Sequence, residues 1–103
     1  MSDEIKIGKP LFENVFGENN TIRVLDFLFM GKDFDFTLTH ISNGTKLSRT
    51  AVRNAIRDLS SKELVIKSRE DKKSNYYKIN KGNNKYKILE TIYKKIMQDV
   101  ISS

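Results

Sequence analysis

Five polar side chains with a regular spacing lie between residues 48 and 60. Arg49, Thr50, Arg53, Asn54 and Arg57 occupy one side of the helix that this segment predicts, and the arginines recur every four residues. An arginine guanidinium can donate two parallel hydrogen bonds to O6 and N7 of guanine, and an asparagine amide can pair in the same way with adenine. The segment therefore carries side chains that can read bases in the major groove of DNA.

The other side of the same segment is apolar. Four side chains follow the i, i+3, i+4, i+7 spacing of a helix that packs on a core: Val52, Ala55, Ile56 and Leu59. Ser48 can cap the first turn, because a serine hydroxyl accepts hydrogen bonds from the free N–H groups there. We therefore predict that residues 48–60 form a recognition helix, held by its apolar face.

The positive charge of the chain is concentrated around this helix. The 103 residues include 19 Lys/Arg and 13 Asp/Glu, which gives a formal net charge of +6. Residues 45–78 hold ten of the basic and four of the acidic residues, whereas the rest of the chain holds nine of each. A positive surface confined in this way is typical of a protein that binds a polyanion. The alternative is a solvated lysine-rich surface.

The segments before residue 39 predict most of a small helical body. Residues 11–16 place apolar side chains on one face of a short helix. A second helix, capped by Asn20 and covering residues 21–30, is apolar almost all round and suits the centre of the domain. Residues 33–38 alternate polar and apolar side chains, which indicates a short edge strand.

The segments on either side of the recognition helix predict a short helix before it and a β-hairpin after it. We expect Thr39 to cap a brief helix at residues 40–45, so that this helix, a turn and the recognition helix make a helix-turn-helix. Strand-forming residues at 64–69 and 75–80 surround a basic polar tip and predict a β-hairpin. Asn84 is expected to cap a last helix of about 17 residues, whose apolar side chains cover more than one stripe.

Residues 41–65, ISNGTKLSRTAVRNAIRDLSSKELV, resemble the core motif of winged helix-turn-helix transcription regulators. Residues 16–28, 33–35 and 77–80 look like small archaeal members of the MarR-like group. The resemblance covers about residues 11–80 and implies an α+β, mostly α fold: a winged helix-turn-helix with a β-hairpin wing at residues 64–80 and a C-terminal dimerisation helix.

This reading divides the chain into three parts. Residues 1–10 form an N-terminal arm, residues 11–80 the winged helix-turn-helix domain, and residues 84–103 the dimerisation helix. Lys46 and Glu63 depart from the family, which often has glycine at these two turns. If the backbone is left-handed there, a non-glycine residue costs on the order of 1 kcal/mol at each position.

The expected DNA contacts fall into two groups. By helix phase, the base-reading candidates are Arg49, Thr50, Arg53 and Asn54. The residues expected at the DNA backbone are Thr39, Lys46, Ser48, Arg57, Arg69, Lys72, Lys73 and Asn75. Phosphate contacts position a protein on the duplex without specifying a sequence, whereas contacts to base edges specify it.

The last helix is more apolar than docking on a monomer requires, and a symmetric homodimer would explain this. The expected interface residues are Leu89, Ile92, Tyr93, Ile96 and Val100. Such a dimer would read a palindromic site with half-sites one helical turn apart, about 34 Å. The sequence does not show whether a small-molecule effector binds.

Several features have a plain structural interpretation beside the functional one. Arg53 could pair with a charge near Asp58 or remain solvated. Tyr76 and Tyr77 favour packing within the wing over base stacking. His40 is expected at the surface, because a lone histidine without other ligands makes no metal site. Asp33 and Asp35 are interpreted as solvated carboxylates.

The composition also limits the class of protein. The chain has no cysteine, no run of 18 apolar residues and no secretory signal pattern at its start, so we expect a cytoplasmic protein without membrane association or cofactor. No nucleophile–base set, phosphate-binding glycine loop or metal cluster appears, so we expect no enzyme. Double-stranded DNA is the expected partner. The alternatives are a non-specific architectural nucleic-acid binder and a winged-helix module that contacts proteins.

Overall fold

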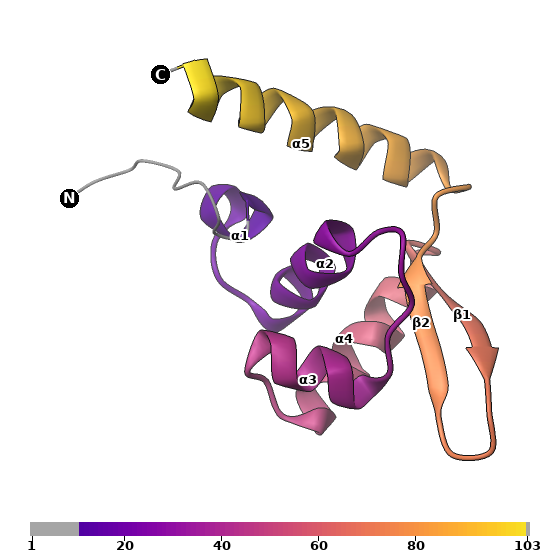
Figure 1. Cartoon of the computed structure of the whole chain (residues 1–103). Helices are drawn as coiled ribbons and strands as arrows, with labels where there is room; N and C mark the ends of the chain where they lie inside the picture. The colour runs from indigo at the N-terminus through magenta and orange to yellow at the C-terminus, as the bar shows by residue number, and fades with distance from the viewer. Residues whose placement is uncertain (1–10, 103) are drawn as a thin grey trace.

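The computed structural model describes residues 11–102, and the predicted arm at residues 1–10 lies outside the described residues. Five helices and one antiparallel hairpin follow one another in the order α1 (Leu11–Phe16), α2 (Asn20–Met30), α3 (Leu38–Thr45), α4 (Arg49–Ser61), β1 (Val65–Glu70), β2 (Asn75–Ile79) and α5 (Asn84–Ser102). Figure 1 shows α3 and α4 below α2, the hairpin at one side and α5 across the top. The predicted α+β, mostly helical class is confirmed.

The core is built where α2 meets α4 and the base of the hairpin. Its fully buried large side chains come from six of the seven elements, all but α5: Phe12, Val24, Leu28, Phe29, Ile41, Val52, Leu59, Val65 and Ile79. An aromatic cluster then attaches α5, because the Tyr93 ring lies 6.0 Å from the ring of Phe12 and 5.0 Å from that of Phe29. The Tyr86 ring lies 5.6 Å from Phe29 in the same cluster.

The helix predicted at residues 48–60 is present as α4. All four side chains of its apolar stripe are buried: Val52, Ala55, Ile56 and Leu59. Ser48 is the N-cap, and its hydroxyl accepts a hydrogen bond from the N–H of Ala51 at 3.1 Å. The predicted hairpin is also present, with Val65 opposite Ile79 at its base and a register shift between Lys67 and Arg69.

The start of α3 differs from the prediction. Thr37, not Thr39, is the N-cap: its hydroxyl accepts from the N–H of His40 at 3.1 Å, while the His40 Nδ1 accepts from the N–H of Thr37 at 3.2 Å. This reciprocal pair satisfies two backbone donors at once, which favours the earlier start. Thr39 therefore lies inside the first turn of α3, and His40, predicted to lie at the surface, is exposed but also serves as part of the cap.

The caps of two other helices also lie one residue earlier than predicted. Asn19 caps α2 by accepting from the N–H of Ile22 at 2.7 Å. The Asn83 side chain accepts from the N–H of Lys85 at 2.7 Å at the start of α5. The predicted strand at residues 33–38 is reduced to one bridge, in which Phe36 and Tyr77 exchange two backbone hydrogen bonds of 2.8 Å.

A buried carboxylate fixes α1 to α2. Asp26 is 1% exposed, and its two oxygens accept from the backbone N–H groups of Phe12 at 3.0 Å and Glu13 at 2.9 Å. Burial raises the pKa of Asp26, although the two backbone hydrogen bonds oppose the shift. The Glu13 carboxylate also pairs with Arg23 at 2.9 Å. Helix α1, too short to be stable alone, is thus held at its first turn by side chains of α2.

Two non-glycine residues have left-handed backbones. Lys46 has φ 65° at the C-cap of α3, and Glu63 has φ 60° between α4 and β1. These are the two turns at which glycine is often found in the family that the sequence resembles. The turns are closed by hydrogen bonds from Lys46 N–H to the Ser42 carbonyl at 2.9 Å and from Leu64 N–H to the Leu59 carbonyl at 3.0 Å.

Replacing either residue with glycine is expected to stabilise the protein. The Lys46→Gly and Glu63→Gly variants each relieve a left-handed backbone, and we expect the free energy of unfolding to rise by up to about 1 kcal/mol. Urea denaturation measures the change. Lys62→Gly is the matched control, because Lys62 has φ −93° and a glycine there only adds entropy to the unfolded chain. Equal effects of Lys62→Gly and Glu63→Gly would contradict the strain argument.

No helix in the described part of the chain is both long and apolar enough to cross a membrane.

Candidate nucleic-acid interface

The outer face of α4 is exposed along its whole length. Arg49, Thr50, Arg53, Asn54 and Arg57 are all exposed, while the apolar stripe behind them is buried. Among the described residues, none of the three guanidinium groups has a hydrogen-bond or ion-pair partner. The alternative pairing of Arg53 near Asp58 is not formed, because the Asp58 carboxylate is bound by Lys62. Three unpaired cations on one rigid helix face form a surface that can accept an anion.

Four predicted contact residues lie around one hollow. The start of α3, the first turn of α4 and the hairpin tip enclose about 150 Å³, lined by polar residues that include Thr39, Arg49, Lys73 and Asn75. These side chains are distant in the sequence, and the fold brings them together. Leu38 and Thr39 of the first turn of α3 line the same hollow, and an anion is favoured near the N-terminus of a helix. The hollow has the size and charge to hold a phosphate group.

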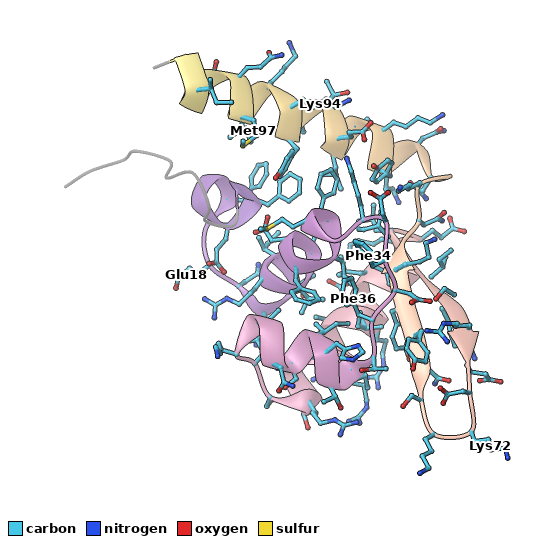
Figure 2. All side chains as sticks on the ribbon, in the orientation of Figure 1. Glu18, Phe34, Phe36, Lys72, Lys94 and Met97 are labelled. Atoms are coloured by element: carbon cyan, nitrogen blue, oxygen red, sulfur yellow. The ribbon has the colours of Figure 1, made fainter. Side chains whose placement is uncertain are left out.

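The hairpin tip projects basic side chains beyond the body of the protein. Lys72 and Lys73 are exposed, and Figure 2 shows Lys72 at the far end of the hairpin. The Asp71 carboxylate orders the turn by accepting from the N–H groups of Lys73 at 3.0 Å and Ser74 at 2.9 Å. These two hydrogen bonds hold the pKa of Asp71 below its usual value. The tip is therefore a defined turn with its lysines facing outward.

Arg69, predicted to contact the DNA backbone, is turned toward the body of the protein. Its Nε donates to the Asp35 carboxylate at 3.0 Å, and its guanidinium carbon lies 3.7 Å from the centre of the Tyr76 ring. The Ser68 hydroxyl donates to the same Asp35 oxygen at 2.7 Å. The half-buried Tyr76 thus packs within the wing, as predicted. This contact, which we call the Asp35 latch (Asp35, Ser68 and Arg69), ties the hairpin to the segment before α3.

The interpretation as a solvated carboxylate was wrong for Asp35, whereas Asp33 is exposed as expected. Asp35 is half-buried in the latch, and Asp33, although exposed, pairs with Lys81. The Ser68 hydroxyl and Arg69 lower the pKa of Asp35. Both partners lie more than 30 residues along the chain, so no local pattern in the sequence could have indicated them.

Asp35→Asn is expected to loosen the hairpin without unfolding the domain. The change removes the charge that holds Arg69, so we expect faster amide hydrogen exchange and lower order parameters in β1 and the tip, measured by NMR. Asp33→Asn is the matched control, since it breaks an exposed pair with Lys81 that does not involve the hairpin strands. A hairpin as rigid in Asp35→Asn as in the wild type would show that the latch contributes no order.

The lowered pKa of Asp35 also determines how the stabilising effect of the Asp35 latch changes with pH. A carboxyl whose pKa is lower in the folded state stabilises that state above its unfolded pKa, near 3.9 for aspartate. This contribution is lost as the pH falls through the folded value. The loosening caused by Asp35→Asn is therefore expected to persist at neutral pH and to disappear in acid, as the wild-type latch also opens.

The remaining predicted residues have the following positions. Lys46, Ser48 and Arg57 are exposed but do not line the hollow, and the Ser48 hydroxyl is engaged as a cap. On α5, three predicted interface residues lie partly buried against the chain's own core: Leu89, Ile92 and Tyr93. Ile96 is half-buried, and the side chain of Val100 lies outside the described residues. Sequence reasoning missed Thr37, Ser74 and Tyr77, which also line the hollow.

The arrangement of these elements is found in solved transcription regulators. A possible transcriptional regulator from Methanosarcina mazei Go1 superposes with a TM-score of 0.59, at 19% identity over 82% of this chain and 71% of that one. A variant of ZitR from Lactococcus lactis gives 0.63, at 23% identity over 85% and 69%. A MarR family regulator from Neisseria meningitidis gives 0.59, at 17% identity over 82% and 61%.

The fold is a winged helix. It is the fold of MarR-family regulators, with α3 and α4 as the helix-turn-helix and β1 and β2 as the wing. No protein-family model matches the chain, and no curated protein matches it in sequence. At these low identities the winged helix is what the similarity establishes, and the chemistry of the exposed α4 face must carry the functional argument.

Proposed function

We propose that this winged helix is a DNA-binding transcription regulator that acts as a homodimer on a palindromic site. The observation that carries the proposal is the unpaired arginine face of α4, flanked by the basic hairpin tip. The solved structures of the same fold are described as transcription regulators or as a possible one, which favours this function over an enzyme. The expected cytoplasmic location belongs to the same proposal.

We expect the exposed residues of α4 to have different roles in DNA binding, according to their position along the helix. Arg49, Thr50, Arg53 and Asn54 lie in the N-terminal half of the helix, which would enter the major groove and contact base edges. Arg57 is one turn further along and would meet the DNA backbone. The 150 Å³ hollow would receive a phosphate, and Lys72 and Lys73 would contact the backbone beside it. Arg69 would act mainly by fixing the wing through the Asp35 latch.

Self-association is proposed through α5. Its N-terminal half already packs on the chain's own core, whereas Ile96, Met97 and Ile101 do not join that core among the described side chains, and Ile101 is 69% exposed. We expect these side chains to meet a second copy, together with the outward surfaces of Leu89, Ile92 and Tyr93. Sedimentation velocity of an Ile96→Asp/Ile101→Asp double variant should give monomers. Ile88→Asp is the control, and a dimer that survives the double change would place the interface elsewhere.

Selection of bound sequences from random duplex DNA tests the function directly. A regulator should enrich one palindrome and bind it about a thousandfold more tightly than unrelated DNA at physiological salt. Equal affinity for all duplexes would instead favour the architectural function, which the basic hairpin tip could support. Absence of DNA binding at low salt would favour a winged-helix module that contacts proteins.

A further inference from the structure

The turn that ends α4 is bonded to the segment that leads into α5. Three consecutive backbone carbonyls of this turn each accept a hydrogen bond from that segment. The Lys62 carbonyl accepts from the Lys85 Nζ at 3.1 Å. The Glu63 carbonyl accepts from the Asn80 Nδ2 at 2.9 Å, and the Leu64 carbonyl accepts from the Asn80 N–H at 2.9 Å. We call these three hydrogen bonds, donated by Asn80 and Lys85, the α4–α5 brace.

The left-handed backbone of Glu63 lies at the centre of the brace. Glu63 has φ 60°, and the N–H of Leu64 returns to the Leu59 carbonyl at 3.0 Å, so the chain reverses directly after α4. A left-handed non-glycine residue persists only where the surrounding structure holds it. The brace supplies such a hold, because it bonds the carbonyl of Glu63 and those of both its neighbours.

Both ends of the Asn80 side chain are engaged. Its Nδ2 donates to the Glu63 carbonyl, whereas its Oδ1 accepts from the N–H of Gly82 at 3.2 Å. Exchanging the two ends would set a donor against a donor, so these partners fix the orientation of the amide. An aspartate at this position keeps the acceptor for Gly82 and loses the donor for Glu63. One hydrogen bond of the brace can therefore be removed without disturbing the other contact of the side chain.

Ring contacts and an ion pair attach α5 to α1 and α2. The Tyr93 ring packs on rings from both of these helices, and Glu90 pairs with Lys32 at 3.3 Å. Ring packing allows several favourable geometries, and an ion pair between partly exposed, flexible side chains is weak. Hydrogen bonds to backbone carbonyls are directional. The brace is therefore the contact best suited to fix the angle between α4 and α5.

A small change in this angle has a large effect at the far end of α5. Figure 1 shows that α5 starts above the base of the hairpin and then crosses over α2 and α1. The helix has 19 residues and is therefore about 28 Å long. A tilt of about 10° at its first turn moves its far end by about 5 Å, which exceeds the rise of about 3.4 Å between base pairs. In a dimer joined through α5, such a tilt would move one α4 relative to the other by more than one base pair.

We propose that Asn80 and Lys85 are positioning residues that set the half-site spacing of the DNA bound by the dimer. This inference rests on the proposed function, because it needs two copies joined through α5 and two α4 helices in the major groove. Neither residue contacts DNA. Each acts by holding the end of α4 at one angle to the start of α5, so that both recognition helices reach the duplex at a fixed separation.

A distance measurement within one chain tests the brace without DNA. The chain has no cysteine, so Thr50→Cys and Gln98→Cys place spin labels at one exposed position each of α4 and α5. Electron–electron double resonance, with unlabelled protein in excess so that only one copy of a dimer carries labels, should give one narrow distance. Asn80→Asp/Lys85→Met should shift or broaden this distance by about 4 Å, the displacement of residue 98 for a tilt of about 10°. An unchanged distribution would overturn the proposal.

A control variant with the same changes of charge keeps the brace intact. Asn84→Asp/Lys87→Met alters exposed residues of α5 whose side chains have no hydrogen bond or ion pair within residues 11–102. It should keep the wild-type distance, and an equal shift in this control would overturn the role of the brace. Lys85→Met alone changes only an exposed side chain, so it provides the test if the double variant does not fold.

Binding to palindromes whose half-sites are separated by different numbers of base pairs tests the effect on DNA. The wild type should prefer one spacing by at least about tenfold. Asn80→Asp/Lys85→Met should reduce this preference at least about fivefold, since each lost hydrogen bond shifts an equilibrium by about two- to twelvefold. Affinity for a single half-site should not change, because the exposed face of α4 is intact. A weaker single half-site with an unchanged spacing preference would overturn the proposal.

The two measurements separate this inference from the proposed function. A chain that binds no DNA, yet shows the shifted distance, would refute the proposed function, whereas the brace would stand as the contact that fixes α5. A chain that binds one palindrome, with a spacing preference that the brace variant does not alter, would refute the positioning role and leave the proposed function untouched.

Discussion

Arg53→Ala is expected to weaken binding to the selected palindrome by about 1–3 kcal/mol per half-site contact, which is roughly 5- to 150-fold. Arg53 is exposed at the middle of the α4 face, has no partner among the described residues, and can approach guanine bidentately. Because the loss is confined to a base contact, affinity for unrelated DNA should change little. Competition binding with the palindrome and a scrambled duplex measures both.

Lys72→Ala is the matched control for that experiment. Lys72 is an exposed cation at the wing tip, so removing it deletes a contact to the DNA backbone. It should weaken all duplexes alike and reduce the slope of log affinity against log salt by about one unit. If Arg53→Ala and Lys72→Ala behaved identically on both duplexes, the division into base-reading and positioning residues would be wrong.

Asp26→Ala is expected to cost about 2–3 kcal/mol of unfolding free energy, a large part of the stability of a domain of this size. The change leaves the N–H groups of Phe12 and Glu13 without their acceptor, and the first of these is buried. Guanidinium denaturation measures the loss, and hydrogen exchange should show α1 opening first. The control is Asp33→Ala, which removes an exposed carboxylate and should leave the free energy of unfolding nearly unchanged.

The stability difference between the wild type and Asp26→Ala is expected to change with pH in one defined direction. Burial raises the pKa of Asp26, so the folded state binds a proton more tightly than the unfolded state. The stability that Asp26 contributes is thus fully present below the unfolded pKa, near 3.9, and declines as the pH rises through the folded value. The stability difference between the wild type and Asp26→Ala should therefore grow as the pH falls. A difference that shrank in acid would contradict the raised pKa.

Local sequence patterns were sufficient to predict those helices and strands whose caps, apolar spacing and turn residues all lie within one short segment. Helix α4 has a complete apolar stripe and a serine cap, and both lie within 14 consecutive residues, so the sequence predicted its bounds and its exposed arginines. The hairpin likewise followed from strand-forming residues on either side of a polar turn. The strained turns at Lys46 and Glu63 were expected from the resemblance and are left-handed.

Caps were predicted one or two residues away from their observed positions, because neighbouring residues offered equivalent side chains. Thr37 and Thr39 can both cap a helix. Thr37 is the observed cap because, from His40 three residues later, the ring nitrogen can accept a hydrogen bond from the Thr37 N–H. Asn19 and Asn20 present the same ambiguity at α2. Such choices depend on the angle at which the chain enters the helix, which the body of the domain sets.

By itself the sequence determined that this protein has a basic, amphipathic helix followed by a hairpin, because periodicity, caps and charge are properties of short segments. Only the tertiary structure decided that Arg69 forms an ion pair with Asp35 and that Tyr93 packs on Phe12 and Phe29. It also decided that Thr39, Arg49 and Lys73 line one hollow. These contacts join residues far apart in the chain. They arise only when the buried face of α4 fixes where each element lies, and the candidate sites depend on them.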